Sequence, residues 1–222
     1  MTNKTKNIND QKAKAKIIFR ILSITYPEAK IALKFSTPIE LLIATILSAQ
    51  CTDKKVNEVT TLLFKKYKKA KDYAETPLSE LQKAIKQTGF FRQKAKSIKG
   101  AMQIVVQQYG GDIPKSMNEL TKLPGVGRKT ANVVLGNAFN IPGLPVDTHV
   151  TRLSQRLGLT KKTTAEDIEQ ELNAIVPKQH WTMFSHLLIH HGRQTCKARA
   201  MLCSSCPISK VCDMYSTLGN KY

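Results

Sequence analysis

The sequence predicts an all-α protein of about ten helices, and two observations support this fold class. Apolar residues recur at three- and four-residue spacings along most of the chain, which is the period of a buried helix face. No stretch alternates apolar and polar residues for long enough to predict a β-strand. Helix start signals recur as well, because Thr37, Ser116 and Thr163 are each followed three residues later by Glu, the pattern of a capping box.

The basic composition predicts a polyanionic partner. The 222 residues, enough for one domain or two small ones, include 35 Lys and Arg against 16 Asp and Glu, a formal net charge of +19. Nucleic acid is the first candidate partner and a membrane surface the second. The longest apolar run, residues 41–47, is too short to span a bilayer, and the Lys-rich N-terminus has no apolar signal-peptide core. We therefore expect a cytoplasmic protein, on the nucleoid when it acts, with no membrane partner.

Apolar spacing, caps and breakers predict where the helices lie. Residues 1–9 carry little apolar content and predict a mobile basic tail. The helix over 38–49 is apolar on nearly all sides, which predicts a central core helix. The basic run over 65–71 is either a phosphate-facing patch or a solvated helix end. Further helices are expected over 10–26, from 52 or 53, over 77–88, from Ile98 to 109, and over 117–123, 128–138, 147–157, 164–176 and 181–192.

A helical hairpin at about 117–136 carries the first functional signal. Pro124 has no amide hydrogen and ends the first helix. Gly125 and Gly127 allow a tight turn and leave no side chain over the backbone. The second helix begins at this turn, so its first amides point outward and form an anion site. In a chain this basic, the expected anion is a nucleic-acid phosphate.

Lys129 and Asp147 are the candidate reactive pair. Lys129 lies in the first turn of the second helix, where the helix dipole and Arg128 disfavour a charged ammonium and so favour a nucleophilic amine. Asp147 follows eighteen residues later, after a loop long enough to return its carboxylate toward Lys129. A Lys beside an Asp in a DNA-binding hairpin suggests attack on a sugar carbon. The residue types alone favour a simpler interpretation, in which Lys129 binds phosphate and Asp147 caps the next helix.

Four cysteines near the C-terminus predict a metal site. Their spacing is C-x6-C-x2-C-x5-C, at Cys196, Cys203, Cys206 and Cys212. Zinc and an iron–sulfur cluster both accept four thiolates, and the presence of a single CxxC pair favours iron–sulfur weakly. The fifth, Cys51, is expected to be a buried small hydrophobic residue. His186 and His190 share a helix face, but no carboxylate accompanies them, which favours core or surface histidines over a metal site.

Several motifs together resemble the endonuclease III family, which are bifunctional DNA glycosylases of base-excision repair. The hairpin reads Leu-Pro-Gly-Val-Gly-Arg-Lys at 123–129, Val-Asp-Thr-His follows at 146–149, and Leu-Ser-Ala-Gln-x-Thr-Asp precedes both at 47–53. With the cysteine pattern, the resemblance covers about 12–213. It implies a helix-hairpin-helix DNA glycosylase fold of two helical lobes. One would be a six-helix lobe over 31–141, and the other a cluster lobe of 1–30 plus 142–222 with a [4Fe-4S] loop over 196–212.

The resemblance also implies functional roles. Lys129 would be the nucleophile and Asp147 its partner, facing each other across a cleft that binds DNA. Gln50 and Phe90 would fill the gap left by the extruded nucleotide. The full implied set adds the DNA-binding residues Gly125, Gly127, Arg128 and His149, and the cluster ligands Cys196, Cys203, Cys206 and Cys212.

The implied activity is removal of oxidised or ring-saturated pyrimidines, with abasic-site lyase cleavage 3′ to the lesion by β-elimination. The partner would be double-stranded DNA containing damaged pyrimidines or abasic sites, bound by a monomer. Thr121 stands where the family often has a carboxylate, which leaves the proton path open. Cys51 also departs from the small residue common there. Two alternatives remain: a monofunctional mismatch glycosylase, which usually lacks a Lys at position 129, and a non-catalytic helix-hairpin-helix DNA-binding protein.

Overall fold

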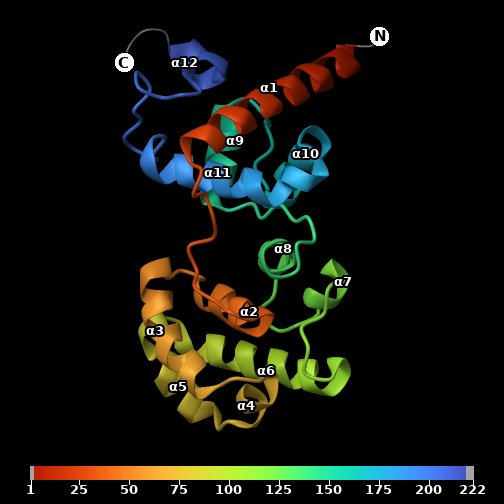
Figure 1. The fold of residues 1–222 in the computed structure, drawn as a ribbon, viewed down its shortest axis with the longest axis vertical. Helices are drawn as coiled ribbons and strands as arrows, with labels where there is room; N and C mark the ends of the chain where they lie inside the picture. The colour runs from red at the N-terminus through yellow and green to blue at the C-terminus, as the bar shows by residue number, and fades with distance from the viewer. Residues whose placement is uncertain (1–2, 219–222) are drawn as a thin grey trace. The chain divides into compact units, whose positions relative to one another are not determined.

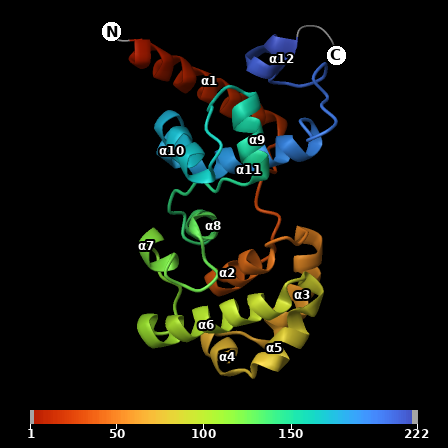
Figure 2. The same ribbon diagram turned by 180° about the vertical axis from the view of Figure 1, so that it is seen from behind.

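The computed structural model describes residues 3–218, and this part of the chain is built from helices (Figures 1 and 2). It contains twelve α-helices and three short 3-10 helices. Instead of strands, the described residues show one isolated bridge, between Cys196 and Met201. The predicted all-α class is therefore confirmed. None of the described helices is both long and apolar enough to cross a lipid bilayer. The chain divides into two compact units, one spanning Ile31–Ile141 and the other formed by the segments before and after it.

The unit Ile31–Ile141 is organised around one buried helix. Its elements are α2 (Pro38–Leu47), α3 (Asp53–Lys66), α4 (Ala70–Glu75), α5 (Leu78–Ile85), η1 (Lys86–Thr88), α6 (Phe91–Tyr109), α7 (Met117–Leu120) and α8 (Arg128–Ala138). As predicted, α2 is the core helix, since every residue from Leu41 to Leu47 is buried. The Thr37 hydroxyl accepts a hydrogen bond from the Glu40 amide and so caps its start.

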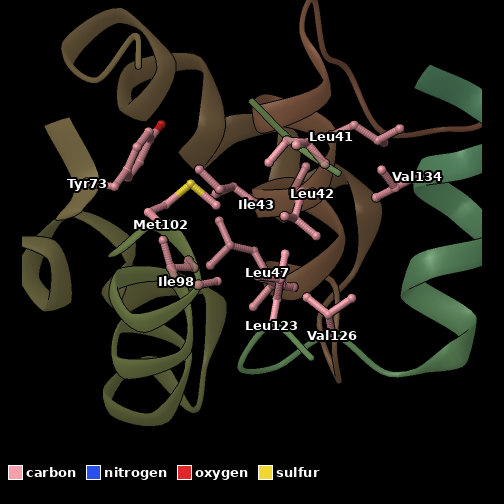
Figure 3. Close-up of a cluster of buried hydrophobic side chains, with 14 of the residues drawn as sticks. Leu41, Leu42, Ile43, Leu47, Tyr73, Ile98, Met102, Leu123, Val126 and Val134 are labelled. Carbon is pink, nitrogen blue, oxygen red and sulfur yellow. The ribbon is translucent and has the colours of Figure 1, made fainter. Parts of the chain in front are cut away.

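Figure 3 shows how this core holds the hairpin. Side chains of α2 meet Tyr73 from α4 and Ile98 and Met102 from α6. Leu123 and Val126, on either side of the hairpin turn, belong to the same buried cluster. Burial of these two side chains fixes the turn on the core, while residues 127–129, which follow it, are exposed.

The second unit packs around α11. Its elements are α1 (Asn3–Thr25), α9 (Thr148–Arg156), α10 (Ala165–Ile175), η2 (Lys178–His180), α11 (Trp181–Gln194), η3 (Ser209–Val211) and α12 (Asp213–Leu218). Helix α11 packs against α1 and α9. Its residues Phe184, Leu187 and Leu188 are fully buried, and Trp181 packs against the same cluster.

The structure corrects the expected helices in five places. Helix α1 begins at Asn3 rather than at residue 10, because Ile8 packs against the core and extends the amphipathic face; residues 1 and 2 lie outside the described part. The short helix α4 begins at Ala70, within the basic run over 65–71, where no helix was expected. The carboxylate of Asp72 accepts hydrogen bonds from the amides of Lys68 and Lys69, which start α4 and lower the pKa of Asp72. Helix α12, after the last cysteine, was also not expected. Helix α6 begins at Phe91, earlier than expected, and α10 is capped by Thr164, whose hydroxyl accepts from the Asp167 amide, rather than by Thr163.

Candidate functional site

The hairpin turn exposes backbone on a rigid support. The Val126 amide donates to the Leu123 carbonyl at 3.0 Å, and Gly125 closes the turn with a φ of +79°. Gly127 is the N-cap of α8, has no side chain to cap the helix and is exposed. A Cβ at Gly127 would meet no protein atom within 4 Å. The start of α8 therefore presents open backbone, as an anion site requires.

Two basic side chains follow this turn. Arg128 and Lys129 are both exposed in the first turn of α8. Thr121, at the position where the family often has a carboxylate, is the C-cap of α7. Its hydroxyl donates a hydrogen bond to the Met117 carbonyl at 2.9 Å and so stabilises the end of this helix.

Asp147 belongs to the other unit and is the N-cap of α9. Its Oδ1 accepts hydrogen bonds from the amides of His149 and Val150, each at 2.8 Å. The simpler interpretation of Asp147 as a helix cap is therefore correct. Because both bonds use Oδ1, the cap leaves Oδ2 for a second partner.

Arg152 ties the start of α9 to the cysteine segment, a link that sequence reasoning missed. Its Nη2 lies 3.2 Å from His149 Nδ1 and donates to the carbonyls of Gly192 and Cys196, each at 3.1 Å. The Arg152 guanidinium thus contacts both the side chain of His149, two residues after Asp147, and the backbone carbonyl of Cys196, the first of the four cysteines. Little in the sequence indicated these contacts, because nothing in it distinguishes Arg152 from a solvent-exposed arginine.

Gln50 and Phe90 share an unusual backbone state. Gln50 has a φ of +51° and Phe90 a φ of +47°, and both are exposed, Phe90 to 66%. Non-glycine residues rarely adopt this left-handed region, and here neither side chain is needed for packing. Phe91 instead packs against the core, and Cys51 is partly buried against it.

The four C-terminal cysteines line one pocket. Cys196, Cys203, Cys206 and Cys212 surround it together with the apolar Leu153, Leu157 and Ile208. None of the four forms a disulfide bond in the described part of the chain. Burial, and to a smaller extent the charges of the other three cysteines, raises the pKa of Cys206 to about 11; burial, with the charges of Cys196 and Cys212, also raises that of Cys203. Four cysteine sulfurs around one pocket are the donor set that an iron–sulfur cluster takes.

Polar partners surround this pocket, and the sequence did not reveal them. Arg156 Nη1 donates to the Cys196 sulfur at 3.2 Å and to the Lys197 carbonyl at 2.9 Å. His191 Nε2 lies 3.5 Å from the Cys206 sulfur, and its Nδ1 lies 3.0 Å from the Tyr26 hydroxyl. Groups of this kind orient the ligands of a metal centre.

The histidines of α11 behave as expected. His186 and His191 are buried, and burial lowers the pKa of each to about 4. His186 is thus a core residue, one of the two placements that the sequence favoured for this histidine.

Comparison with known proteins gives concordant matches. Residues 43–178 match the family described as HhH-GPD superfamily base excision DNA repair protein. The chain is 48% identical over 213 residues to endonuclease III of Synechocystis sp., covering 96% of this chain and 97% of that protein. It also resembles the solved structure of a non-covalent endonuclease III–DNA complex, with a TM-score of 0.88, 41% identity and coverage of 93% of this chain and 97% of that one. A trapped endonuclease III–DNA covalent intermediate matches with the same TM-score and identity, covering 93% and 98%.

The fold, the hairpin and the family match together define a base-excision DNA repair protein of the HhH-GPD superfamily. Such proteins bind DNA, which agrees with the net charge and the open backbone of the hairpin. Within the superfamily, the chain belongs to the endonuclease III family and is a DNA glycosylase with abasic-site lyase activity.

Proposed function

We propose that this glycosylase removes oxidised or ring-saturated pyrimidines from double-stranded DNA and cleaves abasic sites, with Lys129 as the nucleophile. The observation that carries the proposal is the position of Lys129. It is exposed in the first turn of α8, two residues after Gly127, where the open backbone can hold a phosphate next to the amine. A lysine placed there can reach the sugar attached to that phosphate.

The proposed reaction uses the Lys129 amine and the Asp147 carboxylate. The amine attacks the anomeric carbon of the damaged nucleotide, the bond from that carbon to the base breaks, and the base leaves with a proton. Asp147, through the oxygen that does not cap α9, takes a proton from the Lys129 ammonium to free the attacking amine, and it stabilises positive charge on the sugar; this proton leaves with the base. A second proton passes from the new nitrogen–carbon adduct to the ring oxygen, and the sugar opens to an iminium on Lys129. Loss of a proton from the neighbouring carbon then expels the 3′ oxygen and cuts the strand.

The proposed DNA contacts divide into two kinds. Backbone amides around Gly125 and Gly127, together with Arg128 and His149, bind phosphates and position the strand. The exposed Gln50 and Phe90 enter the duplex and fill the gap left when the damaged nucleotide is extruded.

We also propose that Cys196, Cys203, Cys206 and Cys212 hold a [4Fe-4S] cluster. When bound, it supplies folding free energy to the segment after α11, because its ligands come together only in the folded chain. Lys197, Arg199 and Lys210 are exposed on this segment and would present a basic surface to the DNA backbone. The two compact units would then be the hairpin lobe and the cluster lobe of a monomer that acts on the nucleoid in the cytoplasm.

Borohydride trapping tests the proposal. Reduction of the iminium on a duplex with one thymine glycol freezes a stable protein–DNA adduct. We expect an adduct with wild type and with Lys122→Ala, an exposed lysine of the same hairpin, but none with Lys129→Ala. An abasic-site duplex run in parallel separates lesion choice from chemistry.

Other outcomes would select other functions. An adduct on the abasic duplex alone would refute the pyrimidine substrate and keep the lyase chemistry. Base release without any adduct would identify a monofunctional glycosylase. Neither release nor adduct from a folded wild type that binds DNA would indicate a non-catalytic DNA-binding protein.

A further inference from the structure

Lys94 is a buried lysine that joins two distant segments of the unit Ile31–Ile141. It lies in the first turns of α6 and is only 5% exposed. Its ammonium donates to the Leu47 carbonyl at 2.9 Å and to the Thr88 carbonyl at 2.8 Å. Since both oxygens bond one nitrogen, they lie no more than about 6 Å apart.

The two carbonyls end two helices. Leu47 is the last residue of α2, and Thr88 is the last residue of η1. A cation is favourable at such ends, because carbonyl groups there lack helical partners. Burial lowers the pKa of Lys94, so the ammonium is held at a free-energy cost that these contacts offset. Because burying the ammonium costs free energy, filling space in the core does not by itself explain a lysine at this position.

Each anchored carbonyl comes shortly before an exposed residue with left-handed backbone. Gln50 follows Leu47 by three residues, and Phe90 follows Thr88 by two. The Lys94 amide also donates to the Phe90 carbonyl at 3.1 Å. A left-handed conformation costs a non-glycine residue roughly 1–2 kcal/mol. It persists only where the surroundings fix the backbone, and such residues cluster at functional sites.

We propose that Lys94 is a positioning residue that sets the spacing of Gln50 and Phe90, so that both side chains enter the duplex at the same lesion. This inference rests on the proposed insertion role of those two residues. Lys94 itself touches no DNA in this scheme. It acts by fixing the distance between the end of α2 and the end of η1. This distance sets the backbone positions of Gln50 and Phe90, from which the inserting side chains extend.

The same helix offers a matched control. Lys99, also on α6, donates to the carbonyls of Ala74 and Thr76, each at 2.7 Å. It thus makes the same kind of two-carbonyl bridge, at the end of α4. Among the described residues, no non-glycine residue with left-handed backbone follows that bridge until Phe90. A purely structural role for bridging lysines predicts the same consequence at both positions.

The test compares full-length, cluster-loaded wild type with Lys94→Met and Lys99→Met. Methionine keeps an unbranched side chain and removes the ammonium. Each protein is titrated, at one fixed salt concentration, with a duplex carrying one tetrahydrofuran abasic-site analogue and with the undamaged duplex. We expect the ratio of the two affinities to fall about tenfold in Lys94→Met and less than about twofold in Lys99→Met. Affinity for undamaged DNA, which depends on phosphate contacts, should change less than about twofold in both.

A fluorescent base adds a spectroscopic readout. With 2-aminopurine opposite the analogue, binding of wild type and of Lys99→Met should change the fluorescence, since inserted side chains alter stacking in the gap. Lys94→Met should lose this change. An unchanged affinity ratio in Lys94→Met, or an equal fall in Lys99→Met, would overturn the inference.

Variants of the inserting residues separate this inference from the proposed function. If neither Gln50→Ala nor Phe90→Ala lowers the ratio, the insertion role itself is wrong. If both lower it and Lys94→Met does not, only the role of Lys94 is wrong. In the double Gln50→Ala/Phe90→Ala background, Lys94→Met should add less than about a twofold effect. Should Lys94→Met not fold, Lys94→Gln, too short to reach both carbonyls, takes its place, and an unchanged ratio would again overturn the inference.

Discussion

Substitution of the two hairpin glycines by alanine should separate folding from DNA binding. Gly125 has a φ of +79°, which costs an L-residue roughly 1–2 kcal/mol. A Cβ there would also lie 2.7 Å from Ser97 Cβ and 2.9 Å from Ser97 Oγ. Overpacking of this kind typically costs about 1–3 kcal/mol, while reduced freedom of the unfolded chain returns about 0.4–1 kcal/mol. We therefore expect Gly125→Ala to lower the free energy of unfolding by about 2–4 kcal/mol.

Gly127→Ala should behave in the opposite way. Its backbone is extended, with a φ of −87°, and a Cβ would meet nothing within 4 Å, so stability should change by less than about 1 kcal/mol. If a phosphate sits against this backbone, the added methyl group should weaken binding to undamaged duplex about tenfold. Urea unfolding followed by circular dichroism measures the first effect, and fluorescence anisotropy at fixed salt measures the second. Equal stability of the two variants, or unchanged DNA affinity in Gly127→Ala, would refute this reasoning.

Other predictions concern the cores and the cysteine segment. Leu42→Ala, in the α2 core, should cost about 2–5 kcal/mol in urea unfolding, whereas Leu62→Ala, at a site 71% exposed, should stay within about 0.5 kcal/mol. Burial lowers the pKa of His186 from 6.5 to about 4, so the folded state binds fewer protons between these values. Its stability contribution is complete above the higher value and is lost as pH falls. Lowering the pH from 7 to 5 should cost about 2 kcal/mol through His186, and His186→Gln should remove that part of the pH dependence while the part due to His191 stays. Cys206→Ala should abolish the visible absorbance of the iron–sulfur cluster and lower the iron content and the melting temperature; full iron occupancy would contradict the assigned ligand set.

Local features carried most of the sequence prediction. Helix starts at Thr37 and Ser116 were predicted correctly, because a capping hydrogen bond joins residues three apart and leaves a short motif. The buried face of α2 was predicted from apolar residues alone, since burial on all sides excludes polar residues. The four cysteines and the hairpin were recognised because each is a short sequence pattern: closely spaced metal-binding thiols in one case, and a Pro-Gly-x-Gly turn before a helix in the other. The roles of Lys129 and Asp147 stay predictions that the trapping experiment tests.

Tertiary structure decided what long-range contacts determine. Lys94 bonds a carbonyl 47 residues away, and Arg156 bonds a cysteine sulfur 40 residues away. In the sequence these residues look like any other lysine or arginine, because a contact between distant segments imposes no spacing. The start of α1 was missed for the same reason. Ile8 packs against a core that α1 shares with residues more than a hundred positions later in the chain. The sequence by itself thus determined most of the helices and named the candidate reactive groups, and the tertiary structure decided which side chains hold these segments in place.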